Sequence, residues 1–78
     1  MSRLSRLALN DEGFVFDPAT GDSFLVNRCG LLILRALNDG KNNKEVIQAV
    51  ADDYEVSAED AERDVADFRS QLKSLGIE

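Results

Sequence analysis

Residues 13–27, GFVFDPATGDSFLVN, constrain the fold more than any other stretch of the chain. Two short runs rich in aromatic and β-branched residues flank the turn sequence DPATG. Pro18 fixes φ at the first turn position, and Gly21 can adopt the positive φ that closes such a loop. The stretch therefore predicts a β-hairpin with strands over residues 13–17 and 22–26.

A further strand is predicted before the hairpin. Residues 7–9 are apolar, and the turn-forming residues NDEG follow them at 10–13. A strand over residues 7–9 would pair with the hairpin and complete a small antiparallel β-meander. The N-terminal third of the chain is therefore predicted to be a sheet of three strands.

Three helices are predicted after the meander, over residues 28–38, 44–54 and 58–75. Asn27, Asn43 and Ser57 precede them as N-caps, because their side chains can accept a hydrogen bond from an unpaired N–H of the first turn. Gly40 and Gly76 are positioned to end the first and the third helix.

The third helix carries the clearest periodic pattern. Ser57 with Asp60 three residues later approximates a capping box, with Asp where Glu is usual. Apolar residues recur at steps of four and three and form one stripe, namely Ala61, Val65, Phe68, Leu72 and Leu75. Three strands followed by three helices predict an α+β fold, winged-helix-like, and the length of 78 residues predicts a single domain over residues 1–78.

The charge balance argues against nucleic acid as a partner. Nine Lys and Arg are scattered among fifteen Asp and Glu, giving a net charge of −6 without a basic stripe. A winged-helix DNA-binding domain would use the third helix for recognition, but five acidic residues there would repel phosphate: Glu59, Asp60, Glu62, Asp64 and Asp67. The hairpin also precedes the helices, whereas the wing usually follows the recognition helix. A neutral or basic peptide suits the balance better.

The residue inventory disfavours an enzyme. The chain has no His and a single Cys, so it lacks the commonest general base, the commonest metal ligand and any internal disulfide. No cofactor is expected, and the acidic residues are predicted to be solvated surface. Cys29 lies at a helix start, where the pKa of a thiol can fall. The preferred interpretation is that Cys29 and Gly30 are small because this turn packs close to the sheet. A cytoplasmic protein without signal peptide or membrane span is expected.

An ordered set of residues across positions 13–77 resembles the PqqD family, also described as the recognition element for precursors of ribosomally synthesised and post-translationally modified peptides (RiPPs). The residues that carry the resemblance are Phe24-Leu25-Val26-Asn27, Gly30, Ile33-Leu34, Leu37, Asp39-Gly40, Glu45-Val46-Ile47, Asp64-Val65, Phe68, Leu72 and Gly76-Ile77. Val26 stands where Leu is usual, and Arg28-Cys29-Gly30 replaces a small Thr-Ala step. DPATG replaces the Pro-Glu of pyrroloquinoline quinone pathway members, which indicates a relative in another gene setting.

The resemblance implies a non-catalytic peptide chaperone. In this family, the leader segment of a precursor peptide adds a fourth, antiparallel strand beside the third strand and lies in the groove next to the third helix. The bound peptide is then presented to a modifying enzyme, often a radical-SAM protein. The physical basis is β-augmentation, in which an open strand edge offers unpaired N–H and C=O groups and side-chain pockets supply selectivity.

The predicted third strand has the pattern of an open edge. Alternation places Phe24 and Val26 toward the helices and Leu25 on the outer face. Residues 23–26 contain no Pro, Lys or Glu, the residues that usually guard an edge. Two alternatives remain: the strand is central, or a terminus or another subunit covers Leu25. The open edge is favoured, and the predicted peptide-binding residues are Ser23, Phe24, Leu25, Val26, Asn27, Asp60, Arg63, Asp64, Asp67, Phe68 and Gln71.

Three function classes therefore stand at this point. The leading hypothesis is a leader-peptide chaperone with no nucleic-acid or membrane partner. One alternative is a winged-helix-like DNA-binding or regulatory domain. The other is a small structural subunit whose strand edge pairs with a fixed protein partner or with its own copy as a weak homodimer.

Overall fold

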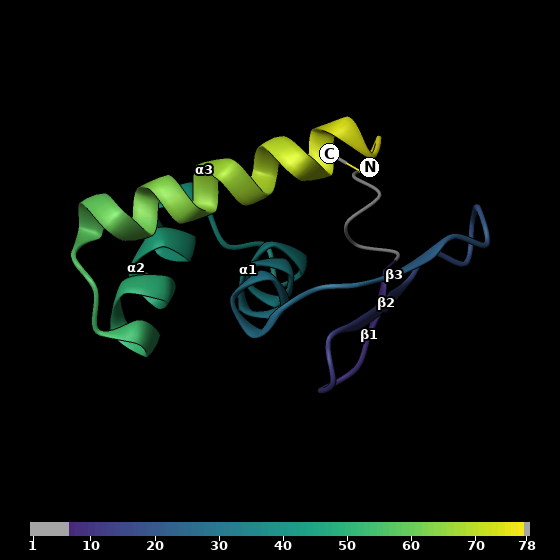
Figure 1. Cartoon of the computed structure of the whole chain (residues 1–78), viewed down its shortest axis with the longest axis horizontal. Helices are drawn as coiled ribbons and strands as arrows, with labels where there is room; N and C mark the ends of the chain where they lie inside the picture. The colour runs from purple at the N-terminus through teal and green to yellow at the C-terminus, as the bar shows by residue number, and fades with distance from the viewer. Residues whose placement is uncertain (1–6, 78) are drawn as a thin grey trace.

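The computed structural model of the chain describes residues 7–77. Three short strands come first and three helices follow, in the α+β order that the sequence predicts (Figure 1). The elements are β1 (Ala8–Leu9), β2 (Phe14–Phe16), β3 (Ser23–Leu25), α1 (Arg28–Asn38), α2 (Asn43–Tyr54) and α3 (Ala58–Ser74). Each strand is shorter than predicted, because the ladder stops where the turns begin.

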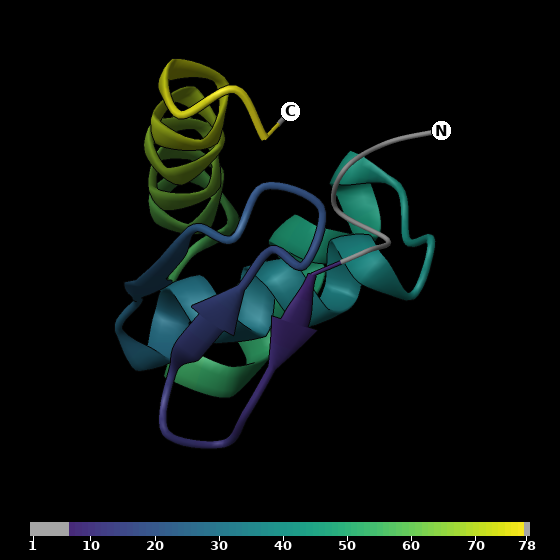
Figure 2. The ribbon, with the colours of Figure 1, turned by 90° about the vertical axis from the view of Figure 1, so that its right-hand side faces the viewer.

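The sheet has the strand order β1-β2-β3, and both pairs are antiparallel. Within residues 7–77, β3 therefore pairs with β2 alone and lies at an edge, so the alternative of a central third strand is wrong. Figure 2 shows β3 on the side of the sheet nearer α3, with β1 on the far side. Val15 at the centre of β2 is fully buried, and it pairs with Phe24 of β3.

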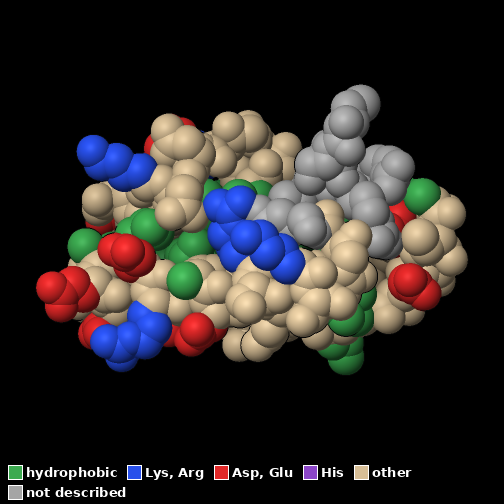
Figure 3. Space-filling view, turned by 90° about the horizontal axis from the view of Figure 1, so that it is seen from above, with side chains coloured by type: hydrophobic (Ala, Val, Ile, Leu, Met, Phe, Trp, Pro, Cys, Tyr) green, Lys and Arg blue, Asp and Glu red, His purple; other side chains and the backbone are tan. Residues whose placement is uncertain are grey.

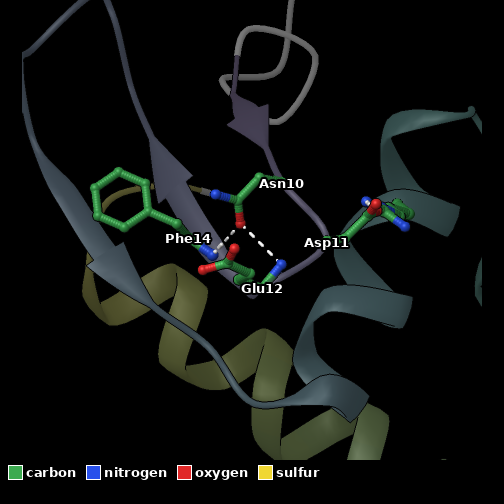
Figure 4. A network of polar contacts seen from close by, with 5 residues as sticks. Asn10, Asp11, Glu12 and Phe14 are labelled. Carbon is green, nitrogen blue, oxygen red and sulfur yellow. Dashed lines mark hydrogen bonds and ion pairs between the residues drawn. The ribbon is translucent and has the colours of Figure 1, made fainter.

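Local hydrogen bonds hold the two turns of the sheet. In the loop before β3, Asp17 Oδ1 accepts from the Ala19 N–H at 2.9 Å, and Gly21 adopts the predicted positive φ of 79°. In the turn between β1 and β2, Asn10 Oδ1 accepts from the N–H groups of Glu12 and Phe14 at 3.0 and 2.9 Å (Figure 4). The side chains therefore fix both turns from within, which sets the register of the sheet.

Side-chain caps begin all three helices. Asn27 Oδ1 accepts from the Gly30 N–H at 2.7 Å, and Ser57 Oγ accepts from the Asp60 N–H at 3.2 Å, as predicted. The prediction for α2 was one residue off, because Asn42 rather than Asn43 is its N-cap. The reason is a capping box: Glu45 lies three residues after Asn42, and each side chain accepts from the other's backbone N–H.

The C-terminal end of α3 departs from the predicted stripe. Ala61, Val65 and Leu72 are buried, but Leu75 is 59% exposed. The helix ends at Ser74 in a Schellman motif, in which Gly76 has a φ of 75° and the Ile77 N–H donates to the Leu72 carbonyl at 2.9 Å. The reversal brings Ile77, only 4% exposed, into the core position that periodicity had assigned to Leu75.

The core consists of two clusters that share two side chains. One cluster lies among the three helices and includes Ile33 and Val65, and the other lies between the sheet and the helices and includes Val15 and Leu72. Phe68, predicted as core, is half-buried and packs against both clusters, as does Leu37. Gly30 allows this packing, because a Cβ there would lie 2.7 Å from Phe68 Cε1 and 3.2 Å from Val26 Cβ.

Replacing Gly30 with Ala is expected to destabilise the protein by about 1–2 kcal/mol, because the new methyl group overpacks the site against the Phe68 ring. The sign of the change in the free energy of unfolding is informative, because replacing Gly with Ala in a helix without a clash stabilises a protein by up to about 1 kcal/mol. Urea unfolding followed by circular dichroism measures the change.

The double variant Gly30→Ala/Phe68→Leu serves as the control. Leu lacks the ring edge that the methyl group meets, so the loss in the double variant should be smaller than the sum of the two single losses. Additive losses, or a Gly30→Ala protein more stable than the parent, would contradict the proposed contact.

Candidate functional site

The free edge of β3 has a defined set of outward-facing backbone groups. The Asp17 N–H donates to the Asp22 carbonyl and the Val26 N–H donates to the Gly13 carbonyl, both at 2.8 Å. Hydrogen-bonded pairs alternate in an antiparallel ladder, so the even-numbered residues at 22, 24 and 26 direct their backbone groups toward β2. Ser23 and Leu25 therefore direct their N–H and C=O groups away from the sheet.

The side chains of β3 follow the predicted alternation. Phe24 and Val26 are half-buried and pack against the cluster between sheet and helices, whereas Leu25 is 73% exposed on the outer face. Phe14 and Phe16 of β2 share that outer face and are also exposed. A strand added beside β3 would therefore extend a sheet with two different faces. One face packs against the helices, and the other carries apolar side chains that are exposed within residues 7–77.

A hollow of about 280 Å³ lies where β3 ends, between the start of α1 and the middle of α3. The residues that line it are Asn27, Cys29, Gly30, Ile33, Asp64, Asp67, Phe68 and Gln71. Five of these were predicted peptide-binding residues. Asp60 and Arg63, also predicted, are exposed on the earlier turns of α3 and do not line this hollow.

Sequence reasoning missed the floor of the hollow, which α1 forms from Cys29, Gly30 and Ile33. The available signal was the pair of small residues directly after a helix cap, since small residues in a first turn mark a close approach by another element. That signal does not identify which element approaches. In the structure the nearest element is α3, through Phe68, and Val26 just after β3 lies almost as close, so the predicted packing of this turn against the sheet is confirmed in part.

A second hollow, of about 320 Å³, lies at the beginning of β3. It is lined by Asp17, Asp22, Ser23, Phe24, Leu75 and Ile77. A shallower one along α3 is lined by Ser70, Gln71, Ser74 and Leu75. Because Gln71 and Leu75 each belong to two of these hollows, the three form one path beside α3. We call this path, with the residues of the three hollows, the β3–α3 groove.

The charge and composition of the described residues limit what the groove can do. Residues 7–77 contain no group of His, Cys, Asp and Glu able to hold a metal ion. Nor does any helix in that range have the length and apolar character needed to cross a membrane. The face formed by α3 shows Asp and Glu side by side with Lys and Arg (Figure 3). This mixture suits a peptide better than a polyphosphate.

The protonation state of Cys29 differs from what its position at a helix start indicated. Burial raises the pKa of the Cys29 thiol, and the carboxylates of Asp64 and Asp53 raise it further. The thiol therefore stays protonated at neutral pH, which excludes the activated thiolate considered from the sequence. Cys29 is a half-buried part of the floor of the groove, and it packs against the helical cluster.

Comparison with known proteins finds one matching family and two similar solved structures. The model of the family described as coenzyme PQQ synthesis protein D (PqqD) matches residues 12–77. A solved structure of a lasso peptide synthetase B1 complexed with the leader peptide is 35% identical, with a TM-score of 0.75, and the match covers 91% of this chain and 85% of that chain.

A second structure, TbiB1 in complex with the TbiA(beta) leader peptide, is 28% identical with a TM-score of 0.79, and the match covers 91% of this chain and 84% of that chain. No curated protein matches the chain. The fold is thus shared by two solved proteins that hold a leader peptide.

The midpoint of the pH–rate profile for Cys29 alkylation by iodoacetamide is expected to lie above that of the urea-unfolded chain, which should fall near the ordinary value of about 8.5. Because the folded state favours the neutral thiol, stability from this group is present below the unfolded pKa and is lost as pH rises toward the folded one.

Asp64→Asn is expected to lower the midpoint, since it removes one of the negative charges beside the thiol. Asp60→Asn, one helical turn away, is the matched control and should leave it unchanged. Equal midpoints for the folded and unfolded protein would rule out the proposed influence of burial and Asp64.

Proposed function

The chain belongs to the PqqD family, and from this we propose that it is a RiPP recognition element that binds the leader segment of a ribosomally synthesised precursor peptide. Recognition elements of this family are non-catalytic peptide-binding domains. We further propose that residues 1–78 act as one such unit, in the cytoplasm where precursor peptides are made.

The observation that carries the proposal is the edge of β3. Ser23 and Leu25 turn their backbone groups away from β2, so an antiparallel leader strand could form about four hydrogen bonds with these two residues. Main-chain pairing of this kind supplies affinity with little dependence on sequence. The leader would become the fourth strand of the sheet.

Selectivity is proposed to come from the β3–α3 groove. A leader strand beside β3 would direct alternate side chains toward the groove, because side chains of a strand point to opposite faces in turn. Residues 24–27 and Asp64, Asp67, Phe68 and Gln71 would then contact the peptide. Asp60 and Arg63 are proposed to contact it only where it extends past the hollow toward the start of α3.

The type of partner enzyme is proposed from the similarity of this chain to known proteins, and not from the geometry of its groove. The family resemblance points to a peptide-modifying enzyme, often of the radical-SAM type. One of the two similar structures, at 35% identity, is instead a lasso peptide synthetase B1. We propose delivery to a peptide-modifying enzyme encoded beside this chain, with lasso peptide synthesis as the first setting to examine.

Leu25→Pro tests the backbone pairing. Proline is tolerated on an edge strand when its nitrogen faces solvent, so the variant should fold with an unchanged circular dichroism spectrum. It lacks the N–H that faces the leader, and the ring crowds the edge, so leader affinity should fall at least about tenfold. Isothermal titration with a synthetic leader encoded in the same gene cluster measures the loss.

Leu25→Ala is the matched control, because it truncates the side chain while keeping the N–H. Its affinity should fall less than that of Leu25→Pro. A folded Leu25→Pro protein that binds the leader as tightly as the parent would exclude pairing through this position.

Amide chemical shifts separate the three function classes. Shifts confined to residues 22–27 and the groove on adding leader support the proposal. Shifts on adding duplex DNA, with steep salt dependence, would favour the DNA-binding alternative. Shifts of β3 that change with protein concentration alone would indicate self-pairing of the edge, as in the weak homodimer.

A further inference from the structure

We infer that the leader carries a Lys or Arg near the N-terminal end of its paired segment and an apolar side chain about four residues later. The inference rests on the proposed function, including its antiparallel pairing, and adds the chemistry of two leader side chains and their order. It follows from a difference between the two ends of the β3–α3 groove.

The end of the groove near the start of α1 is acidic. Asp64 and Asp67 line it together with the amides of Asn27 and Gln71. Neither carboxylate forms an ion pair within residues 7–77, where the salt bridge found joins Arg35 to Asp11. Arg63, one turn before Asp67, does not line the hollow. Two negative charges beside an open strand edge favour a cationic side chain on the incoming strand.

Asp64 also lies close to the floor of this hollow. Burial first, and then the carboxylates of Asp64 and Asp53, raise the pKa of the Cys29 thiol, which forms part of that floor. The negative potential is therefore felt where a peptide side chain would enter, and not only in the solvent outside. A Lys or Arg there would meet both carboxylates.

The opposite end of the groove is mainly apolar, with one exposed carboxylate, that of Asp22. Phe24, Leu75 and Ile77 line it, and Leu75 is 59% exposed. Asp22 and Asp17 also contribute, but Asp17 is buried and its Oδ1 accepts from the Ala19 N–H, so that carboxylate is committed to the turn. An apolar peptide side chain covering Leu75 would remove that surface from water.

The separation of about four residues between the two leader side chains follows from the geometry of α3 and β3, the two sides of the groove. From Asp67 to Leu75 the helix advances about 12 Å at 1.5 Å per residue. From Ser23 to Asn27 the extended backbone covers about 13 Å at 3.3 Å per residue. A paired strand crosses that distance in about four residues, and positions four apart point to the same face of a strand. One side chain at each end of the groove is therefore compatible with a single extended segment.

The direction follows from antiparallel pairing. β3 begins at the apolar end of the groove and finishes at the acidic end. An antiparallel partner runs the opposite way, so its N-terminal residues lie beside Asp64 and Asp67. The cationic residue therefore precedes the apolar one in the leader.

A charge-matched pair of variants tests the inference. Asp64→Asn/Asp67→Asn should weaken binding of the synthetic leader from the same gene cluster about five- to tenfold at low salt, and the difference should shrink at about 0.5 M NaCl. Glu59→Gln/Glu62→Gln removes the same charge from exposed positions of α3 that do not line the groove, and should leave the affinity unchanged.

The leader supplies the other half of a double-mutant cycle. Replacing its first Lys or Arg in the paired segment with Gln should weaken binding to the parent protein but not to the Asp64→Asn/Asp67→Asn protein. A nitroxide at the N-terminus of the leader should broaden the amide signals near Asp64 more than those near Asp22.

Failures of the two proposals give different results. If the leader binds but neither the Asp variants nor the Gln substitution changes its affinity, the inference is overturned while the proposed function stands. Broadening near Asp22 instead of Asp64 overturns the direction. If the parent protein does not bind the leader at all, the proposed function fails, and the inference fails with it.

Discussion

The contact between Phe68 and Gly30 joins the parts of this small fold that make a groove possible. Phe68 packs against both core clusters, and a Cβ on Gly30 would lie 2.7 Å from its ring. Gly30 is also the residue whose N–H is capped by Asn27, two residues after the end of β3. The end of the edge strand, the first turn of α1 and the middle of α3 thus meet at one point, and the acidic hollow opens beside it.

An unguarded strand edge is a hazard for aggregation, and proteins usually block it with charge, proline or a covering element. Here the net charge of −6 acts against pairing between copies, since like charges repel as two chains approach. The same charge attracts a cationic segment. The acidic character that the sequence shows from the outset therefore opposes self-pairing of β3 while favouring the ligand proposed for it.

Features fixed by neighbours within a few residues were predictable from the sequence. The caps at Asn27 and Ser57 and the turn at Gly21 depend on side chains bonding to nearby backbone, and all three are confirmed. The cap of α2 was misassigned because two Asn residues adjoin, and only the spacing to Glu45 distinguishes them. Leu75 was misassigned because the apolar period was continued past a helix end that the Schellman motif at Gly76 determines.

The site was predictable only in part, for a related reason. Strand alternation was sufficient to predict that Leu25 is exposed and that Phe24 points inward. The floor of the hollow, from Cys29 to Ile33, depends instead on how α1 packs against α3, which no local sequence pattern specifies. The misassigned Leu75 belongs to the same groove: the reversal that brings Ile77 into the core leaves Leu75 facing the start of β3. The end of α3 therefore closes the core and, by the same turn, supplies the apolar end of the groove.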